Sequence, residues 1–384
     1  MGSYINIFNF VPSTTGVLQS EFIILVKTDN VGTSADNQFT IPIGPFVGSY
    51  NYDVDWGDGN TDTGLTTSTT HTYASAGTYT IKISGTFPKI YFNNGGDKLK
   101  LLEVQNWGAI LWQRMDRSFF GCTNMTITAT DVPDFSTLIN GTFDVMFSNC
   151  EALIGGNLSN WNTSGFTSLS NAFAFSSASF TGLFNADLSS WDVSNVTSFS
   201  SMFILSDSFN NGGASGIGNW NVSNATTFSR MFQQTPFNQD ISSWNTTNCT
   251  NMQYMFFGNT AFNQDISSWD VSNVITFNSM FSSASSFNQN LGAWDISSLI
   301  NAQQIFRNSA MSTANYTDTI VSWANQVFTN SGPFNIDMTT QTGRTFDTSR
   351  SGGANFANAG AARTYLTTAT PTGAGWTISS DTVI

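Results

Sequence analysis

Positively charged residues are scarce in this chain of 384 residues. Lys and Arg together number 12 against 25 Asp and Glu, which gives a formal net charge of −13. So few cations cannot neutralise many phosphates, and we therefore expect neither nucleic acid nor an anionic membrane surface as a partner. Charged residues make up only 10% of the chain, whereas aromatic residues make up 14%. Low charge with many aromatic residues predicts a folded chain.

Histidine and cysteine are too few to build the common reactive centres. The chain has one His and three Cys, which are Cys122, Cys150 and Cys249. That leaves little material for a zinc site or a histidine-based catalytic centre, and an odd number of cysteines does not indicate a disulfide framework. The sequence also lacks the Walker, G-x-S-x-G and H-E-x-x-H motifs. We therefore expect no enzyme, no cofactor and no metal, and cysteines that are buried free thiols.

Long apolar stretches are missing as well. No window of about 18 apolar residues occurs, so we expect no membrane insertion. The N-terminus has no Lys or Arg before Lys27 and no long apolar run, so we expect no secretory signal peptide. Residues 1–20 are interpreted as an N-terminal extension of the first domain.

Short alternating runs fill residues 21–88. They are FIILVKT, NQFTIP, YNYDVDWGDG and THTYASAGTYTIKISG, separated by Gly, Pro, Asn and Asp. In the last run Tyr79, Ile81 and Ile83 alternate with Thr80 and Lys82, which is the period of a half-buried strand. Such runs predict the strands of a small β-sandwich.

This segment also carries a family resemblance. Residues 54–59 (VDWGDG), 71–73 (HTY) and 76–80 (AGTYT) together resemble a polycystic-kidney-disease (PKD) domain. The resemblance implies an immunoglobulin-like sandwich that serves as a spacer or adhesion module on extracellular proteins, with His71 as a structural residue. Asp53, Asp55 and Asp58 do not follow the spacing of an EF-hand, so we expect a polar turn there and not a calcium site.

From residue 100 onward the chain is periodic. Eight phenylalanines recur at steps of 24 to 30 residues: Phe120, Phe147, Phe173, Phe203, Phe232, Phe256, Phe281 and Phe306. Five of these, at 147, 203, 232, 256 and 281, directly follow a methionine. A tryptophan stands twelve residues before each of the last six: Trp161, Trp191, Trp220, Trp244, Trp269 and Trp294. A second phenylalanine stands seven residues before four of the tryptophans: Phe184, Phe237, Phe262 and Phe287. A fixed period of this length predicts stacked repeats.

One unit, FNQDISSWDVSNVITFNSMFSSASS from Phe262, predicts how a coil is built. Ile266, Trp269 and Val271 follow the spacing of a leucine-rich-repeat strand, which turns Ser268 and Asp270 outward. The stretch TFNSMF is expected to form a short helical or 3₁₀ turn with its Met and Phe inward. The asparagine after the strand is expected to turn the chain and to bond the next coil, at Asn195, Asn224, Asn248 and Asn273. One coil cannot bury so many large side chains alone, so the tryptophans are expected to hold stacked coils together.

The motif FNQDISSWDVSNV with its following Met-Phe resembles the BspA-like leucine-rich-repeat surface proteins, in their lipoprotein-type repeat of about 25 residues. The resemblance covers about residues 118–384. It implies a right-handed leucine-rich-repeat-like solenoid that binds or adheres and does not catalyse. The unit departs from the usual repeat because its Asn follows Val by two residues, which is one residue short.

Together these patterns predict a mainly β protein in five parts. They are an N-terminal extension (1–20), a PKD-like β-sandwich (21–88), an N-terminal solenoid cap (89–117), a leucine-rich-repeat-like solenoid (118–306) and a C-terminal cap (307–384). Within the last part, residues 316–323 and 361–366 are expected to be helical. A cap is needed because the last coil would otherwise expose Trp294 and Phe306.

A polar row beside the tryptophans is the candidate ligand-binding surface. It comprises Asp192, Asn221, Asn245, Asp270, Asp295, Ser190, Ser243 and Ser268. Between residues 118 and 306 the sequence has eleven Asp or Glu and a single cation, Arg230. Such a negative surface suits neutral glycans or a cationic protein patch, and the alternative is a solvated face without a partner. Asp240 and Asp265 recur with the same period, which indicates a turn or packing position more than a glycosidase pair.

Three functions are consistent with these modules. A bacteriophage virion protein, as a tail or fibre component that binds the host surface, would explain adhesin-like modules without a signal peptide, because virions assemble in the cytoplasm. A bacterial cell-surface or secreted adhesin of the BspA-like type is the alternative, and a polysaccharide-degrading enzyme is the remote one. We favour the virion protein, with a host surface glycan or protein and neighbouring virion proteins as partners, and a homo-oligomer is left open.

Overall fold

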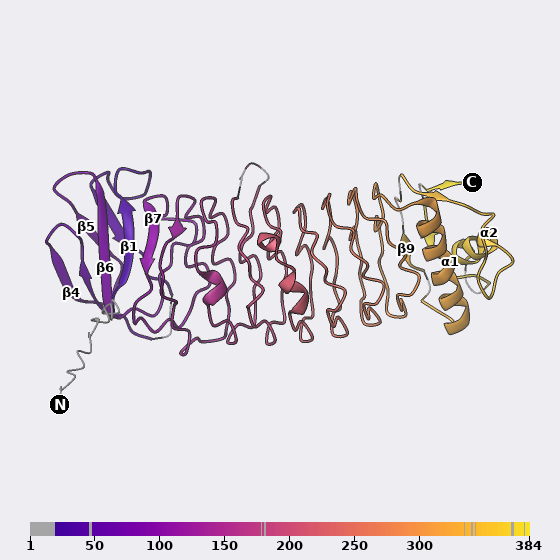
Figure 1. The fold of residues 1–384 in the computed structure, drawn as a ribbon, viewed down its shortest axis with the longest axis horizontal. Helices are drawn as coiled ribbons and strands as arrows, with labels where there is room; N and C mark the ends of the chain where they lie inside the picture. The colour runs from indigo at the N-terminus through magenta and orange to yellow at the C-terminus, as the bar shows by residue number, and fades with distance from the viewer. Residues whose placement is uncertain are drawn as a thin grey trace, which may run out of the picture.

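The computed structural model describes residues 20–384, apart from residues 46–47, 178, 180–181, 334, 339–340, 342, 370–371 and 380. Nearly all of the N-terminal extension therefore lies outside the described residues. The molecule is elongated, with strands at one end, a long stack of coils in the middle and helices at the other end (Figure 1). The secondary structure is mainly β with few helices, as expected.

Two sheets build the N-terminal end. Its strands are β1 (Phe22–Lys27), β2 (Gln38–Ile41), β3 (Asn51–Asp55), β4 (Thr61–Leu65), β5 (Thr69–Thr72) and β6 (Thr78–Thr86). β2 pairs antiparallel with β5, and the other strands belong to a six-stranded sheet of order β4-β3-β6-β1-β7-β8. In β6 Ile81 and Ile83 are buried while Thr80 and Lys82 are half-buried, so the alternation of the sequence is present in the strand.

The larger sheet continues into the coils. β7 (Leu101–Asn106) pairs antiparallel with β1, and β8 (Thr126–Ile127) pairs parallel with β7. Trp107 and Trp112 pack against Phe22 of β1, with ring centroids 5.8 and 5.0 Å away. Residues 89–117 therefore join the N-terminal sheets to the first coil through one continuous sheet and one aromatic cluster.

A buried cation fastens the loop between β1 and β2. The Lys100 side chain is fully buried, and its Nζ donates to the carbonyls of Ser34, Ala35 and Gln38 at 2.8 to 3.1 Å. The equally buried carboxylate of Asp97 accepts hydrogen bonds from the backbone N–H groups of Thr33 and Ser34 in the same loop and of Thr40 in β2. Because every polar atom here has a partner, the loop is held against residues 97–100.

Single parallel bridges connect each coil to the next one. They run through Thr142, Ser168, Ser198, Thr227, Asn251, Thr276 and Asn301, and finally to Asp337. The expected strand at Ile266–Val271 is wrong, because no named strand covers these residues and the bridge lies at Thr276. The chain turns at Asp265, at Trp269 and again at Asp270, so it cannot stay extended there.

The expected turn at TFNSMF is present, with the N–H of Met280 donating to the Phe277 carbonyl at 2.9 Å and with Met280 and Phe281 buried, but it is a turn and not a helix. Ser279 within the segment and Ser283 just after it adopt left-handed conformations, with φ of 54° and 60°. Alternate N–H groups, such as those of Phe277 and Ser279, donate to carbonyls of the next coil at 2.9 and 2.8 Å. A helix would need those N–H groups for its own bonds. The left-handed residue before the buried Met-Phe position recurs at Val145, Asn171, Ser201, Arg230, Tyr254 and Gln304.

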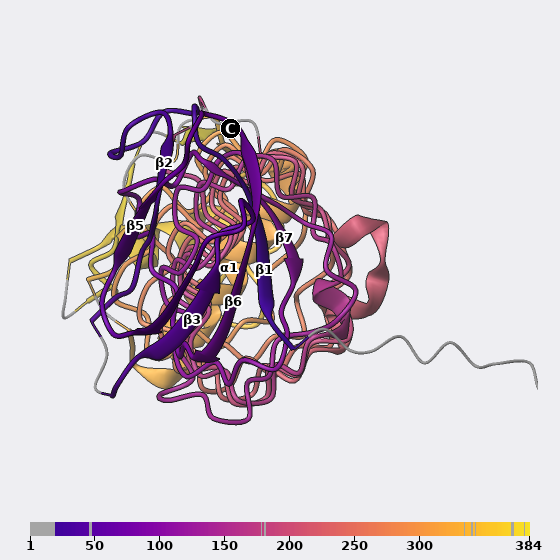
Figure 2. The same cartoon turned by 90° about the vertical axis from the view of Figure 1, so that its left-hand side faces the viewer.

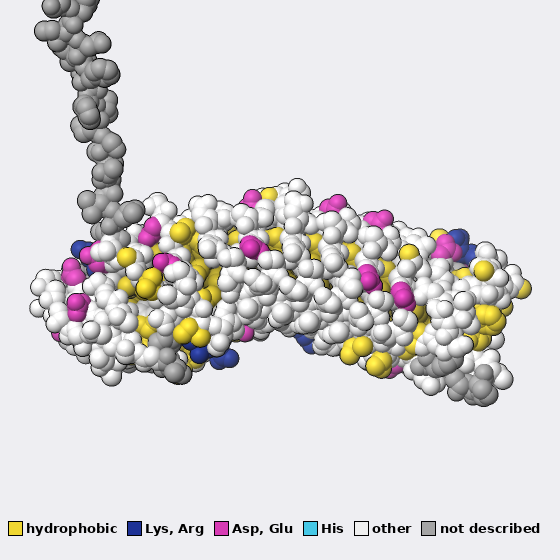
Figure 3. Space-filling model, turned by 90° about the horizontal axis from the view of Figure 1, so that it is seen from below, with side chains coloured by type: hydrophobic (Ala, Val, Ile, Leu, Met, Phe, Trp, Pro, Cys, Tyr) yellow, Lys and Arg dark blue, Asp and Glu magenta, His cyan; other side chains and the backbone are white. Residues whose placement is uncertain are grey.

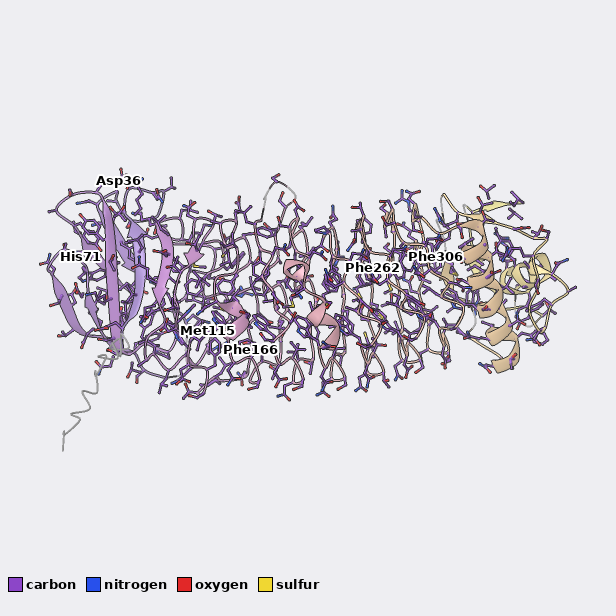
Figure 4. The ribbon with its side chains drawn as sticks, viewed as in Figure 1. Asp36, His71, Met115, Phe166, Phe262 and Phe306 are labelled. Atoms are coloured by element: carbon purple, nitrogen blue, oxygen red, sulfur yellow. The ribbon has the colours of Figure 1, made fainter. Side chains whose placement is uncertain are left out.

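A column of phenylalanine rings runs through the interior of the stack. Neighbouring rings stack with centroids 5.7 to 6.2 Å apart, through Phe119, Phe147, Phe173, Phe203, Phe232, Phe256, Phe281 and Phe306. The first member is Phe119 and not the expected Phe120, which is only half-buried. Figure 4 marks Phe262 and Phe306, both fully buried within the coils. Short 3₁₀ helices occur at η1 (Leu158–Asn160), η2 (Asn211–Gly213) and η3 (Ser215–Asn219).

Helices cover the last coil. α1 (Thr313–Asn330) begins after Ser312, whose side chain accepts from the N–H of Asn315, and it buries Ile320 and Trp323. Both expected helices are confirmed, the second as α2 (Ala359–Thr367). Short strands complete this end in the described residues, where β9 (Asp337–Met338) pairs with β11 (Thr377–Ile378) and β10 (Thr345–Phe346) pairs with β12 (Thr382–Val383).

Seen along the axis, the coils lie behind the N-terminal strands (Figure 2). None of the described helices has the length and hydrophobicity that crossing a bilayer requires.

Candidate functional site

The tryptophan turn is the most regular feature of each coil. In the coil of Trp269, the carbonyl of Ile266 accepts the backbone N–H of Trp269 at 3.1 Å and the indole N–H of Trp294 from the next coil at 3.0 Å. The same indole bond to the preceding coil is made by Trp191, Trp220, Trp244, Trp269, Trp294 and Trp323. The tryptophans are thus buried and positioned by hydrogen bonds as well as by packing.

All eight residues of the expected polar row are exposed. Each Asp or Asn of the row accepts a hydrogen bond from the N–H two residues later, which is an Asx turn. The distances are 3.0 Å at Asp192, 3.0 Å at Asp270 and 2.9 Å at Asp295. The amides of Asn221 and Asn245 make the same bond at 3.2 Å. The row therefore has a structural role in addition to any role in binding.

A second row, which the sequence did not single out for binding, lies four residues before the tryptophans. Asp187, Asp240, Asp265 and Asn290 each accept the N–H two residues later at 2.9 Å. Asp240 and Asp265 are therefore turn residues, as their period indicated. We call the two rows and the exposed serines between them (Ser190, Ser243 and Ser268) the polar flank.

Turn geometry keeps the flank charged. Hydrogen bonds from the side chain and the backbone N–H of the serine two residues later lower the pKa of Asp192 and Asp270. At Asp240 and Asp265 the backbone bond is the larger cause of the lowered pKa, followed by the serine side chain. These carboxylates are ionised at neutral pH, and each is held in one orientation by its turn.

The serine hydroxyls of the polar flank form hydrogen bonds between neighbouring coils. The hydroxyls of Ser243 and Ser268 donate to the carbonyls of Gly218 and Ser242 in the preceding coil, at 2.6 and 3.1 Å, and Ser190 bonds Ser159 in the same way. The groups left to meet a ligand are therefore carboxylate oxygens and the amide nitrogens of the Asn residues.

Two asparagine ladders join the coils. The expected turn asparagines donate from Nδ2 to a carbonyl of the preceding coil, at 2.7 to 2.9 Å, from Asn195, Asn224, Asn248 and Asn273. A second ladder was missed, in which the Oδ1 of one Asn accepts the N–H of its counterpart in the next coil, through Asn185, Asn210, Asn238, Asn263 and Asn288. The tripeptide Phe-Asn-Gln, which recurs at residues 237–239, 262–264 and 287–289, was the sequence pattern that could have indicated this ladder.

The flank ends in a cavity of about 430 Å³ where the coils meet α1. The coil side provides Asp265, Ser267 and Asn290, and the helix provides Asn315 and Ser322. Gly292 and Ala293 stand where three other coils, those of Trp191, Trp244 and Trp269, have two serines. A Cβ at Gly292 would come within 2.6 Å of the Ser322 hydroxyl oxygen. The small residues therefore let the helix approach closely and leave polar groups around the cavity.

The cysteines and the single histidine are structural. The three cysteines are buried and free, and burial raises the pKa of Cys249 to about 12. His71 stacks on Trp56 with centroids 4.8 Å apart and bonds the carboxylate of Asp58 at 2.9 Å. Across the residues that the structure describes, no group of three or more His, Cys, Asp or Glu side chains could hold a metal ion.

A family model with the description "Mycoplasma protein of unknown function, DUF285" matches residues 113–215 and again residues 212–323. The two stretches together span more than half of the chain. The chain belongs to this family. The DUF285 stretches coincide with the coils, and the second ends at Trp323, the last residue of the indole ladder. The DUF285 match agrees in broad terms with the expected relation to repeat-containing surface proteins. Neither curated proteins nor solved structures gave a match.

Proposed function

We propose that the chain is a non-enzymatic adhesion protein, displayed on a surface, which binds a neutral glycan through the polar flank. The observation that carries the proposal is the repetition of exposed carboxylates and amides, each fixed by its own turn, along successive coils. Carboxylates and amides are the groups that hydrogen-bond sugar hydroxyls, and a rigid row loses little entropy on binding.

The charge of the coils is consistent with this ligand class. Charged side chains are sparse on the face seen in Figure 3, and Asp and Glu outnumber Lys and Arg there. Single contacts of this kind are weak, so useful adhesion requires several copies of the chain on one particle, acting through avidity.

The finer architecture belongs to the same proposal. We interpret the coils as a right-handed leucine-rich-repeat-like solenoid of the BspA-like type and the N-terminal sheets as a PKD-like spacer. The second interpretation is supported by the aromatic turn in which Trp56 stacks on His71 and the Tyr73 hydroxyl donates to the Trp56 carbonyl at 3.1 Å.

The test of the flank replaces Asp192, Asp270 and Asp295 together by Asn. Asn already forms the same turn at positions 221 and 245, so folding is retained, whereas Lys would remove three turn bonds. Binding of beads coated with the full chain to a printed array of neutral glycans should fall by about tenfold or more. The matched control removes three charges outside the coils, at the exposed Asp29 and Asp36 and at the half-buried Asp347, whose turn Asn can also form, and it should bind like the parent.

Two results would overturn this assignment. Equal binding by the flank variant and the parent would exclude the flank as the binding surface. Binding of the parent only to cationic proteins, with strong weakening by added salt, would identify a basic protein patch as the partner in place of a neutral glycan.

The surface that carries the chain is a separate question with two candidates. One candidate is a bacteriophage virion, where neighbouring virion proteins would hold the chain. The family match favours a bacterial cell, because its description names Mycoplasma. Immunogold labelling with an antibody to the purified chain distinguishes them, since label on phage tails supports the first and label on cell envelopes supports the second.

A further inference from the structure

One corner of one coil is a residue shorter than its counterparts. Five residues separate the paired phenylalanines in three coils (Phe203 and Phe209, Phe256 and Phe262, Phe281 and Phe287), but only four separate Phe232 from Phe237. The shortened corner reads Gln-Gln-Thr-Pro and contains the proline at position 236.

The packing of the paired phenylalanine rings in the interior is unchanged in the shorter coil. The ring centroids of Phe232 and Phe237 are 3.8 Å apart, and the matching distances in the other three coils are 3.6, 3.9 and 3.8 Å. Because both rings keep their places, the missing residue is lost from the outer surface. A notch of about 320 Å³ lies there, lined by Asp207, Gln234, Thr235, Pro236, Gly258 and Thr260.

Several polar groups of the notch have no partner in the protein. Within the described part of the chain, the Asp207 carboxylate and the Thr260 hydroxyl make no hydrogen bond or ion pair, and the Gln234 amide nitrogen donates none. This contrasts with the polar flank, where turns and ladders use most of the polar atoms. The Asp207 side chain is exposed, and desolvation by the neighbouring residues raises its pKa.

We infer that this notch, formed by Asp207, Gln234, Pro236, Gly258 and Thr260, is a binding site for a single neutral sugar ring. Its volume lies at the small end of ligand sites, which run from roughly 300 to 1,000 Å³, so it accommodates one ring and no longer chain. The carboxylate accepts, the amide donates and the hydroxyl does both, which matches the mixed donors and acceptors of a polyol.

Other ligand classes fit the same residues less well. A metal ion would require further carboxylates, and the notch has one. An alkylammonium ligand favours an aromatic cage, and no aromatic side chain lines the notch. An anionic ligand would meet the charge of Asp207 without a compensating cation. The ring of Pro236 and the face of Gly258 provide the apolar surface against which the C–H face of a sugar can lie.

The experiment uses the full chain and free hexoses. Saturation-transfer NMR with glucose, galactose, mannose and N-acetylglucosamine at millimolar concentration should detect binding of at least one sugar. Thr260→Trp fills the notch and should abolish the transfer, whereas Ser285→Trp, at the equivalent corner of the next coil, should not. Asp207→Asn, a change at a residue without protein partners, should weaken binding by about tenfold, which corresponds to about 1.4 kcal/mol.

The sugar-binding test of the notch can fail without a failure of the glycan-binding test of the polar flank. Transfer that persists in Thr260→Trp, or the absence of transfer from every sugar to the parent, would overturn the notch assignment. If Thr260→Trp fails to fold, unchanged affinity in Asp207→Asn would overturn it as well. The flank variant with Asn at 192, 270 and 295 should bind free hexoses like the parent, so the notch and the flank can fail independently.

Discussion

Replacing Trp269 by alanine should lower the free energy of unfolding by about 3–5 kcal/mol, as is usual for a large aromatic in a packed core. The side chain is 3% exposed and lies in the middle of the array. Its ring stacks on that of Trp244, with centroids 6.3 Å apart and planes within 4° of each other. Its indole N–H donates to the carbonyl of Ile241 at 3.0 Å.

The two contributions can be separated with a second substitution. The Ile241 carbonyl also accepts the backbone N–H of Trp244 at 3.1 Å, so it keeps a partner when the indole is lost. The hydrogen bond alone is therefore worth about 1 kcal/mol, and packing accounts for the rest. Trp269→Phe, which keeps most of the ring but has no N–H, should cost about 1–3 kcal/mol.

The assay is urea unfolding of the purified full chain, followed by circular dichroism. Ser267→Ala is the control on the same turn, because its backbone N–H keeps its bond to Asp265 at 2.9 Å. It should change the stability by less than about 1 kcal/mol. If the alanine variants at 267 and 269 have equal, small effects, the tryptophans do not hold the coils together as described.

Three further predictions concern polar groups. Lys100→Met should cost about 3–5 kcal/mol in urea unfolding, because it leaves the buried Asp97 carboxylate without its cation, and a loss below about 1 kcal/mol would contradict that role. Asn273→Asp should cost about 1–3 kcal/mol, since a carboxylate oxygen would replace the Nδ2 that donates to the Thr247 carbonyl, with Asn278→Asp on the same coil as a comparison that should cost less. The lowered pKa of Asp192, Asp240, Asp265 and Asp270 stabilises the fold above the ordinary value of 3.8, and that stabilisation should be lost as pH falls below it. Melting temperatures measured from neutral pH downward should show this loss, and a variant with Asn at all four positions should lose less.

The interior of the coils could be predicted in part from the sequence, because large aromatic side chains that recur at a fixed period are normally buried. The period of Trp and Phe identified the buried tryptophans and the phenylalanine column, but not the equally buried Phe166, Phe199 and Phe228. Phe119 was missed because Phe120 stands next to it. Pairs of adjacent aromatics cannot be resolved by period alone, since either residue can face inward. The two helices of the C-terminal end were predictable for a similar reason, because their apolar residues recur with a helical spacing.

The backbone path was harder to predict. Val145, Arg230 and Tyr254 adopt left-handed conformations although none is glycine or asparagine, so no local preference reveals them. They are imposed by bonds between coils, which depend on residues about 25 positions away. The strand was misplaced for the same reason, because Asx turns at Asp265 and Asp270 override the apolar alternation. Of the candidate site, the exposed row could be predicted, but the notch could not, since it depends on one absent residue.

The covered ends of the stack give the molecule a defined length. At one end β7 and β8 join the first coil to a sheet, and at the other α1 lies over the last coil and completes the indole ladder with Trp323. Because the described residues at both ends pack against a terminal coil, the number of coils sets the distance between the two ends. Each whole unit gained or lost would change that distance by about 4.8 Å. The spacing of the two ends is therefore a property of the repeat number, independent of how each end is built.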